Sequence, residues 1–570
     1  MSKITIADPG TRKKIIPLVM GIANMIIEKL EFVKKINEAV KWDQRHWNIS
    51  PGGLLKVLIL STFTDMRVPL SHLEERMEGI DVEIFLEAGD KSSFVNESNV
   101  GEALDRLGEV EYERMYETMA LSAVKEYKIP IRKMHSDTTT ISFYGDYDAE
   151  KLKLSEEEKE VVLSIERGYN KDGRAGCKQA VVGQITNESG IPLVSRTLDG
   201  GTSDIDWNRE AIKYAADIAK SGFEEGIYVA DSKLVIEEHI TTMNDPAKRV
   251  QFVSRCPANF KDKLESRTIK KAYEKCAWNT MGSISDVKGA TQYKGISFVE
   301  EICGAPMRLL VLESDELLNK AHQTVAKKEE ELILLIKALE KQEWMCRADA
   351  EIERERFLSL KQLSIFECEV RIEMQTIEKW SPGRRSAKTK PTIIETCHLC
   401  VEKVTKSESA YQEFIQNESC FVLISNVAAG MDDKDLLRTY KGQQVVENSF
   451  RNLKSPHLAS VIYLQNPKRI QVLAMLLTFA LLIRALIQFR LREGLKAFEE
   501  TNPGKEIRAG WGGRPLNNPT FKLLYEHSVN CCFERESHRN YSFSWPSVEA
   551  KSRVEPLLVL MGITLQQILP

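Results

Sequence analysis

The sequence predicts a mixed α/β protein with a helical N-terminal region. Apolar residues recur at helical spacing within the first 128 residues, as in Ile22–Val33 and Leu54–Phe63. From about residue 129 the pattern changes to strands, because Met134–Tyr144 is rich in Thr, Ile, Phe and Tyr, which fit a pleated surface. Ala180–Thr186 and Ile191–Thr197 follow as a hairpin, and helix and strand then alternate, which is typical of a mixed sheet.

The length and the local composition divide the chain into several regions. A chain of 570 residues is too long for a single compact core. Residues 307–381 contain no glycine or proline, and a charged helical stretch lies at about 315–361. Strand-like runs around it, which include Met307–Leu312 and Cys420–Ser425, indicate an inserted module. We predict a helical N-terminal domain at 1–128, an α/β core in two parts at 129–258 and 430–500, an α+β insertion domain at 259–429, and a C-terminal tail at 501–570.

The bulk composition indicates an intracellular globular protein. The net charge is −4, from 79 Lys and Arg against 83 Asp and Glu, so the chain lacks the basic character that is usual in nucleic-acid-binding domains. The 11 cysteines do not form the pattern of a disulfide framework, and the N-terminus has no signal-peptide pattern. The most apolar run, Val472–Ile483, is shorter than the roughly 20 residues of a membrane span, so we predict a core helix there and no membrane partner.

Two aspartates stand where a sheet protein can hold a ligand. Asp137 lies within a predicted strand, on the same side as Ile141 and Phe143, and a charge on an apolar face requires a partner or a metal ion. Asp231 directly follows the short apolar strand at 226–230, at the edge where ligands gather in α/β sheets. A single aspartate in either place is more often a cap or an ion pair, so neither is specific alone.

A predicted helix at 432–454 supplies a third carboxylate. Acidic residues begin this helix and Ser455–Pro456 ends it. At about 100° per residue, four of its polar residues fall within an arc of roughly 60° that apolar side chains flank: Tyr440, Gln443, Glu447 and Lys454. Glu447 is therefore predicted to face inward. The alternative, a buried Glu447–Lys454 ion pair, needs a contact across two turns, beyond the usual reach on a helix.

The segment Tyr440–Lys454 resembles the Y-x2-R-x3-E-x6-K signature of DDE transposases from bacterial insertion sequences. Tyr, Glu and Lys match at their spacing, whereas Gln443 stands at the arginine position. His135–Thr139 and Val229–Ser232 are similar to the strands that carry the family's first and second aspartates. Gly168–Gly173 and Gly200–Asp204 resemble segments between them, and Trp42–Leu70 with Leu104–Leu107 resembles the preceding helical domain, which is expected to bind DNA ends.

The resemblance implies an RNase H-like catalytic core that an insertion domain interrupts between the second aspartate and the glutamate. It implies a metal-dependent transposase that cleaves DNA at the element ends and joins the 3′-hydroxyl to target DNA. Asp137, Asp231 and Glu447 are the expected ligands of two Mg²⁺ ions, with Mn²⁺ as a substitute, because two hard cations stabilise the attacking and leaving oxygens of a phosphoryl transfer.

The same resemblance implies the partners. Tyr440, Gln443 and Lys454 are expected to contact the DNA backbone, although Gln443 offers only a neutral amide where arginine offers a charged planar fork. The expected partners are double-stranded DNA, as element terminal repeats and target, and a second copy of the chain in a homodimer that pairs the two ends. The expected location is the cytoplasm of a prokaryotic cell, at the nucleoid.

A basic loop and two weaker signals lie within the predicted insertion. Residues 379–391 contain no acid, and we predict backbone contacts to DNA from their cations: Arg384, Arg385, Lys388 and Lys390. Plain solvation is the alternative, as for any charge run. Trp380 is a candidate for stacking on a flipped base, with packing as the alternative. Cys397–Cys400 has a zinc-like spacing but no clear second pair.

Two other functions fit the same sequence. An RNase H-like nuclease would cut DNA without joining strands. A non-catalytic DNA-binding protein derived from a transposase would be marked by a broken site, and Gln443 at the usual arginine position is the feature that favours it.

Overall fold

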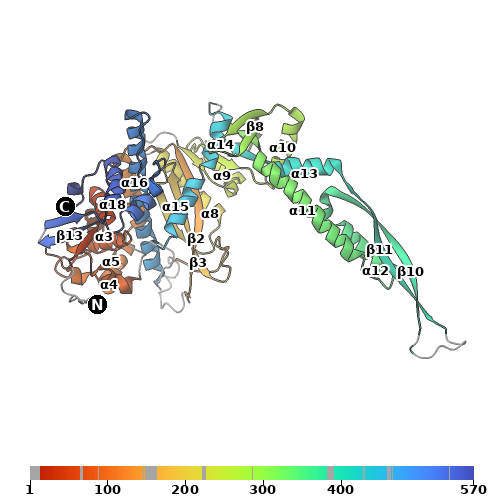
Figure 1. The fold of residues 1–570 in the computed structure, drawn as a ribbon, viewed down its shortest axis with the longest axis horizontal. Helices are drawn as coiled ribbons and strands as arrows, with labels where there is room; N and C mark the ends of the chain where they lie inside the picture. The colour runs from red at the N-terminus through yellow and green to blue at the C-terminus, as the bar shows by residue number, and fades with distance from the viewer. Residues whose placement is uncertain are drawn as a thin grey trace. The chain divides into compact units, whose positions relative to one another are not determined.

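The computed structural model describes residues 13–64, 69–87, 89–145, 147, 163–220, 226–285, 287–380, 382, 390–427, 430–456, 458, 464, 466–537 and 540–569. The chain forms two compact units, and their elements are labelled in Figure 1. The first unit comprises Met1–Leu234, Thr242–Phe252 and Thr439–Pro570. The second comprises Val235–Thr241 and Val253–Arg438.

Helices fill the N-terminal part of the first unit, as the sequence predicts. They are α1 (Leu18–Lys29), α2 (Phe32–Ala39), α3 (Pro51–Ser61), α4 (Leu73–Met77), α5 (Glu97–Gly108) and α6 (Tyr112–Glu126). Ser50 caps α3 by accepting a hydrogen bond from the Gly53 amide, and Pro51 is the first helical residue. Gly52 allows α2 and α3 to touch, because a Cβ there would lie 2.7 Å from the Val33 carbonyl oxygen.

A mixed sheet lies at the centre of the first unit. Its strands run in the order β4 (Pro192–Leu198), β3 (Lys178–Asn187), β2 (Lys133–Phe143) and β5 (Ile227–Val229). β3 is antiparallel to both β2 and β4, whereas β5 is parallel to β2. The predicted strands at Met134–Tyr144, Ala180–Thr186 and Ile191–Thr197 are confirmed to within a few residues.

Helices cover both faces of this sheet. On one face, α8 (Asp204–Lys220) packs through Trp207, whose indole N–H donates to the Ser136 hydroxyl at 2.9 Å. The Trp207 ring lies over Gly183, where a Cβ would come within 2.5 Å of the ring. On the other face, α15 (Gln444–Leu453) and α16 (Pro467–Thr501) contact the sheet through side-chain hydrogen bonds to β3 and β4. The sheet is therefore buried on both sides.

The structure differs from the prediction of one continuous helix at 432–454. Two helices occupy this segment, α14 (Asp433–Lys441) and α15, with a turn at Gly442 and Gln443. Hydrogen bonds from Val445 to Gly442 and from Val446 to Gln443 span three residues rather than four, so the turn is tighter than an α-helix. A Cβ on Gly442 would lie 2.8 Å from the His135 ring, so a glycine fits where this turn lies against β2.

The apolar run Val472–Ile483 lies within α16 and is a core helix, as predicted. Within the described ranges, α16 is the single helix that matches a membrane span in length and composition, yet 94% of its apolar window is buried inside the protein. Phe479 packs against Phe32 with ring centroids 4.8 Å apart. Arg484 is accommodated in this core because its guanidinium donates to the Thr62 carbonyl and lies over an aromatic ring.

The C-terminal segment folds onto the N-terminal helices. It contains α17 (Phe521–His527), β13 (Cys532–Ser537), β14 (Asn540–Ser544) and α18 (Val548–Leu560). β13 pairs on one side with β14 and on the other with β1 (Ile15–Pro17), and all pairs are antiparallel. The carboxylate of Asp81 is buried beside this sheet, where it accepts hydrogen bonds from Arg535 at 3.2 Å and from the Tyr541 hydroxyl at 2.7 Å.

The second unit contains an antiparallel sheet. Its order is β6 (Phe252–Arg255), β12 (Cys420–Ser425), β9 (Ala305–Ser314), β8 (Gln292–Ile302) and β7 (Asn279–Ser283). The first residue of β6 belongs to the first unit. The helices near this sheet in sequence are α9 (Glu237–Asn244), which is divided between the units, and α10 (Leu264–Lys275). The strands predicted at Met307–Leu312 and Cys420–Ser425 are confirmed.

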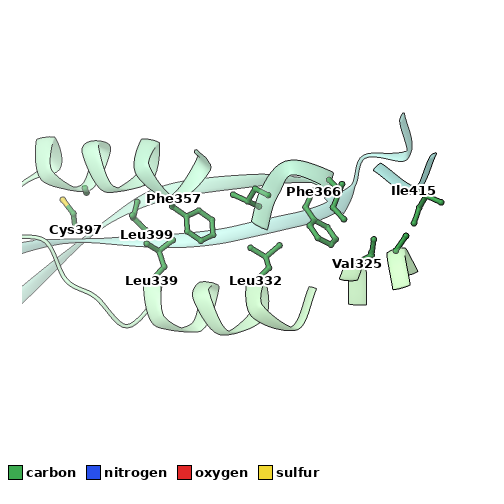
Figure 2. Packing of buried hydrophobic residues seen from close by; sticks show 12 residues of the cluster. Val325, Leu332, Leu339, Phe357, Phe366, Cys397, Leu399 and Ile415 are labelled. Atoms are coloured by element: carbon green, nitrogen blue, oxygen red, sulfur yellow. The ribbon is translucent and has the colours of Figure 1, made fainter. Parts of the chain in front are cut away.

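Two long helices and a hairpin form a separate core within the second unit. The helices α11 (Asp315–Leu339) and α12 (Arg347–Leu358) pack on the hairpin of β10 (Phe366–Lys379) and β11 (Thr392–Lys406), and α13 (Glu408–Ser419) packs on α11. Figure 2 shows Leu339 and Phe357 from the two long helices meeting Leu399 of β11. The hairpin extends beyond the helices that cover its base (Figure 1).

We expect Asp81→Ala to destabilise the first unit by about 2–3 kcal/mol, because it removes a buried carboxylate, leaves the Tyr541 hydroxyl without its acceptor and leaves Arg535 with Glu83 alone. Thermal unfolding of the full chain measures this loss. The matched control is Glu536→Gln, which alters an exposed ion pair with Lys13 and is expected to leave the melting temperature unchanged. Equal effects of the two substitutions would contradict the assigned role of Asp81.

Candidate active site

Two of the predicted carboxylates lie on neighbouring parallel strands. The register of β2 with β5 pairs His135 with Val229. Asp137 and Asp231 each lie two residues further along their segments, so the register places them level with each other, just past the end of β5. Because adjacent strands are only about 4.8 Å apart, both carboxylates belong to one edge of the sheet.

A third carboxylate reaches the same place, and it is not one of the predicted ligands. Asp204 is the first residue of α8, and its Oδ1 accepts a hydrogen bond from the hydroxyl of Thr138, next to Asp137. In the sequence, Asp204 was noted only as the last residue of Gly200–Asp204, a segment that resembles part of the transposase family. Its place in the site depends on how α8 packs on β2, which no local pattern reports.

Lys171 lies among these aspartates. Its ammonium is 2.9 Å from Asp204 Oδ1 and 3.5 Å from Asp137 Oδ1. It also donates to the Thr138 hydroxyl at 2.7 Å and to the Thr138 carbonyl oxygen at 3.1 Å. The ammonium is therefore surrounded by oxygen atoms, as a bound cation would be.

Asn170 holds the turn that carries Lys171. Its buried side-chain amide donates to Gln179 Oε1 and to the Ser142 hydroxyl, both at 3.0 Å. Its oxygen accepts hydrogen bonds from the backbone amides of Asp172 and Arg174. These bonds tie the turn to β2 and β3, so the position of Lys171 is defined by the sheet.

At the site, the negative charge of three aspartates exceeds the positive charge of Lys171. The pKa of Asp137 is raised to about 6, mainly by burial and further by the charges of Asp231 and Asp204, while Lys171 and the Thr138 amide act in the opposite direction. Burial and the charge of Asp204 also raise the pKa of Asp231. Burial lowers the pKa of Lys171, but the nearby carboxylates outweigh it and the net shift is upward.

The donor atoms at this place suit a hard divalent cation, although no complete site is assembled. Among the described residues, no three His, Cys, Asp or Glu side chains are arranged as a metal-binding group. Carboxylate oxygens are the ligands that Mg²⁺ prefers, and carboxyls with raised pKa values gain most from an added cation. The residues Asp137, Asp204 and Asp231 therefore fit such an ion.

Glu447 does not face inward as the sequence analysis predicted. It lies on α15 and is exposed, while Val446, Ser449 and Phe450 form the buried face. The break at Gly442 changes the phase of α15 relative to Tyr440, so the arc calculated for one straight helix does not apply. α15 nevertheless lies on the face of the sheet that carries Asp137, since Ser449 donates to Gln184, the residue paired with Asp137.

Gln443 binds the protein backbone next to Asp137. Its side-chain amide donates to the Ser136 carbonyl oxygen at 2.6 Å, which attaches the start of α15 to β2. Burial lowers the pKa of the neighbouring His135 to about 4, so this imidazole is neutral near pH 7. The side-chain amide of Gln443 thus makes a contact within the protein. The DNA contact predicted for Gln443 stays a prediction.

The other predicted DNA contacts are spread over both units. Lys454 is paired with Asp172, at 2.7 and 2.9 Å from its two oxygens, and Tyr440 is half-buried at the end of α14. In the second unit, Trp380 is half-buried after β10 and Lys390 is exposed before β11. Three predicted contacts lie outside the described residues: Arg384, Arg385 and Lys388.

The zinc-like spacing of Cys397 and Cys400 belongs to a strand. Both residues lie in β11, where Cys397 is paired with Met374 and Cys400 with Arg371. Side chains three positions apart in a strand point to opposite faces, so these two thiols cannot bind one ion. Cys397 is instead part of the apolar core shown in Figure 2.

Comparison with known proteins adds little to this geometry. Residues 14–121, less than half of the chain, match a family described as a domain of unknown function (DUF4277). No curated protein of similar sequence was found. One solved structure with some similarity is a piggyBac transposase synaptic complex with hairpin DNA, at 8% identity and a TM-score of 0.35, covering 84% of this chain and 76% of that one. At this level of similarity, neither fold nor function follows from the comparison.

We expect Asp137→Asn to stabilise the metal-free protein at neutral pH. The pKa of Asp137 is about 6 in the folded protein, against an ordinary value of 3.8. The folded protein therefore loses stability relative to the unfolded chain as the pH rises from about 4 to about 6. The substitution should therefore raise the free energy of unfolding by about 1–3 kcal/mol at and above about pH 7, and have little effect near pH 4.

Unfolding in EDTA over this pH range measures the effect. Asp206→Asn is the control, because hydrogen bonds from Ser203 and Arg209 lower the pKa of Asp206, which gives the opposite sign. A constant difference between Asp137→Asn and wild type at all pH values would show that Asp137 titrates normally.

Proposed function

We propose that this chain is a DNA transposase of an insertion sequence. It would cleave DNA at the element ends and join the 3′-hydroxyl to target DNA by metal-dependent phosphoryl transfer. The observation that carries the proposal is the level placement of Asp137 and Asp231 on adjacent parallel segments, since these are the two aspartates that the motif resemblance selects. Their raised pKa values support a role in cation binding.

The arrangement of the first unit supports an RNase H-like core. Three antiparallel strands are followed by a strand parallel to the first of them, with helices on both faces. The larger segment of the second unit, Val253–Arg438, lies in sequence between Asp231 and Glu447. This is where the resemblance implies an insertion domain.

In the proposed mechanism, Asp137, Asp231 and Glu447 would hold two Mg²⁺ ions, for which Mn²⁺ could substitute. Ions bound there would supply positive charge for the attacking and leaving oxygens of a phosphoryl transfer. Gln443 and Ser449 hold α15, and with it Glu447, against the strand pair that carries Asp137. Tyr440 and Lys454 contact phosphates near the cleaved bond, and Lys454 must leave Asp172 to do so.

The proposed partners are the terminal repeats of the element and a double-stranded DNA target. A homodimer would bring the two ends together, in the prokaryotic cytoplasm. The helical N-terminal domain and the loop that follows Trp380 are the proposed DNA-binding parts.

The exposed position of Glu447 favours one alternative, a transposase-derived protein that binds DNA without cleaving it. A nuclease that cuts without joining is the other. Cleavage of DNA would distinguish a transposase from the non-catalytic DNA-binding protein. Strand-transfer products would distinguish it from the nuclease.

The test is Mg²⁺-dependent cleavage of a supercoiled plasmid that carries the native element ends. Asp137→Ala, Asp231→Ala and Glu447→Gln are each expected to lower cleavage by more than about 100-fold, since even residues behind metal ligands affect activity by 10- to 100-fold. DNA binding, measured by gel shift, is expected to persist. The control is Lys213→Met, an exposed lysine of α8 paired with Glu210.

Cleavage that survives in Glu447→Gln would remove Glu447 from the mechanism. Specific binding by wild type with no cleavage would establish the non-catalytic alternative.

A further inference from the structure

Two charged side chains of the turn Asn170–Asp172 are paired with residues of the proposed site. On one side, the ammonium of Lys171 lies 2.9 Å from Asp204 and 3.5 Å from Asp137. On the other side, the carboxylate of Asp172 holds Lys454 through both oxygens, at 2.7 and 2.9 Å. The ammonium of Lys171 thus lies where the proposed divalent cation would bind. The carboxylate of Asp172 lies where a DNA phosphate would contact Lys454.

We propose that Lys171 and Asp172 are an internal substitute for the divalent cation and the DNA phosphate, and that both ion pairs open when the site is loaded. This inference rests on the proposed function. Lys171 is accordingly a positioning residue, which holds Asp137 and Asp204 together until a divalent cation replaces it. Asp172 keeps Lys454 in place until a phosphate takes over the lysine.

The surroundings of Lys171 support competition with a cation. Its four oxygen contacts come from Asp137, Asp204 and Thr138, so an ion bound at Asp137 would compete with the ammonium for the same place. The ammonium side chain is 27% exposed, so it has a path to solvent. The backbone of the turn is held independently, because Asn170 is bonded to Gln179 and Ser142 and the Lys171 amide donates to Thr140. The side chain can therefore move without unfolding the turn.

The surroundings of Lys454 support the second exchange. Lys454 follows α15 directly and is 23% exposed, and Asp172 is 37% exposed. Since an ion pair with this exposure contributes little stability, a DNA phosphate can replace the Asp172 carboxylate at low cost.

The first experiment measures Mn²⁺ binding to the full chain without DNA, by titration calorimetry. Lys171→Met is expected to bind Mn²⁺ roughly 10-fold more tightly than wild type, because the competing ammonium is gone. Its melting temperature in EDTA should fall below that of wild type and recover with Mn²⁺. Lys171→Arg should stay close to wild type in both respects, and Lys213→Met controls for loss of a lysine on the same unit.

The outcomes separate this inference from the proposed function. Unchanged or weaker Mn²⁺ binding by Lys171→Met, with wild-type binding that Asp137→Ala abolishes, overturns the role of Lys171 and leaves the metal site standing. Absence of Mn²⁺ binding in wild type and in Lys171→Met overturns both.

The second experiment measures the affinity for a DNA duplex of arbitrary sequence at a fixed, low salt concentration. Asp172→Asn removes the ion pair that a phosphate must break to reach Lys454, so the affinity should rise by about 3-fold. The double variant Asp172→Asn, Lys454→Met should lose this gain, and Asp206→Asn is the matched control for loss of an exposed aspartate. An affinity that Asp172→Asn raises no more than Asp206→Asn does would overturn the role of Asp172.

Discussion

The parallel pairing of β2 with β5 determines where Asp137 and Asp231 lie, because a strand register leaves no freedom along the strand direction. A shift of one residue would move every side chain of one strand to the opposite face. The register is protected on both sides of the sheet. On one face, the Trp207 ring of α8 packs over Gly183. On the other face, the side chain of Gln443 attaches α15 to the Ser136 carbonyl oxygen.

Charge balance is the second constraint, and it follows from the first. Once the register brings Asp137 and Asp231 together and α8 adds Asp204, the site needs positive charge. The Asn170 turn supplies it through Lys171. Its side-chain hydrogen bonds to β2 and β3 make this compensation part of the fold, and they explain why a turn remote in sequence lies at the site.

The helical N-terminal region is attached to the same sheet by buried polar contacts. Arg196 of β4 pairs with Glu113 at 3.1 Å and with Glu117, both on α6. The hydroxyl of Tyr116 donates to the Pro192 carbonyl at the start of β4. Loss of one partner of a buried ion pair leaves the other charge without compensation, which is strongly destabilising. These contacts therefore hold α6 in one orientation on the sheet.

The sequence alone determined the elements whose patterns are local. Composition rich in Thr, Ile, Phe and Tyr located β2, and the helical spacing of apolar residues located α3. These follow from backbone geometry and neighbouring side chains, so a short window contains the information. The segment after Pro503 carried no such pattern, and its pairing of β13 with β1 was not predicted.

The candidate site was predictable only in part. Motif spacing singled out Asp137 and Asp231, but the orientation of Glu447 depended on the turn at Gly442, which separates α14 from α15 and lies against His135. The places of Asp204 and Lys171 depended on the packing of α8 and of the Asn170 turn against β2. Contacts between segments far apart in sequence are set by shape and burial across the whole sheet, and only the tertiary structure decides them.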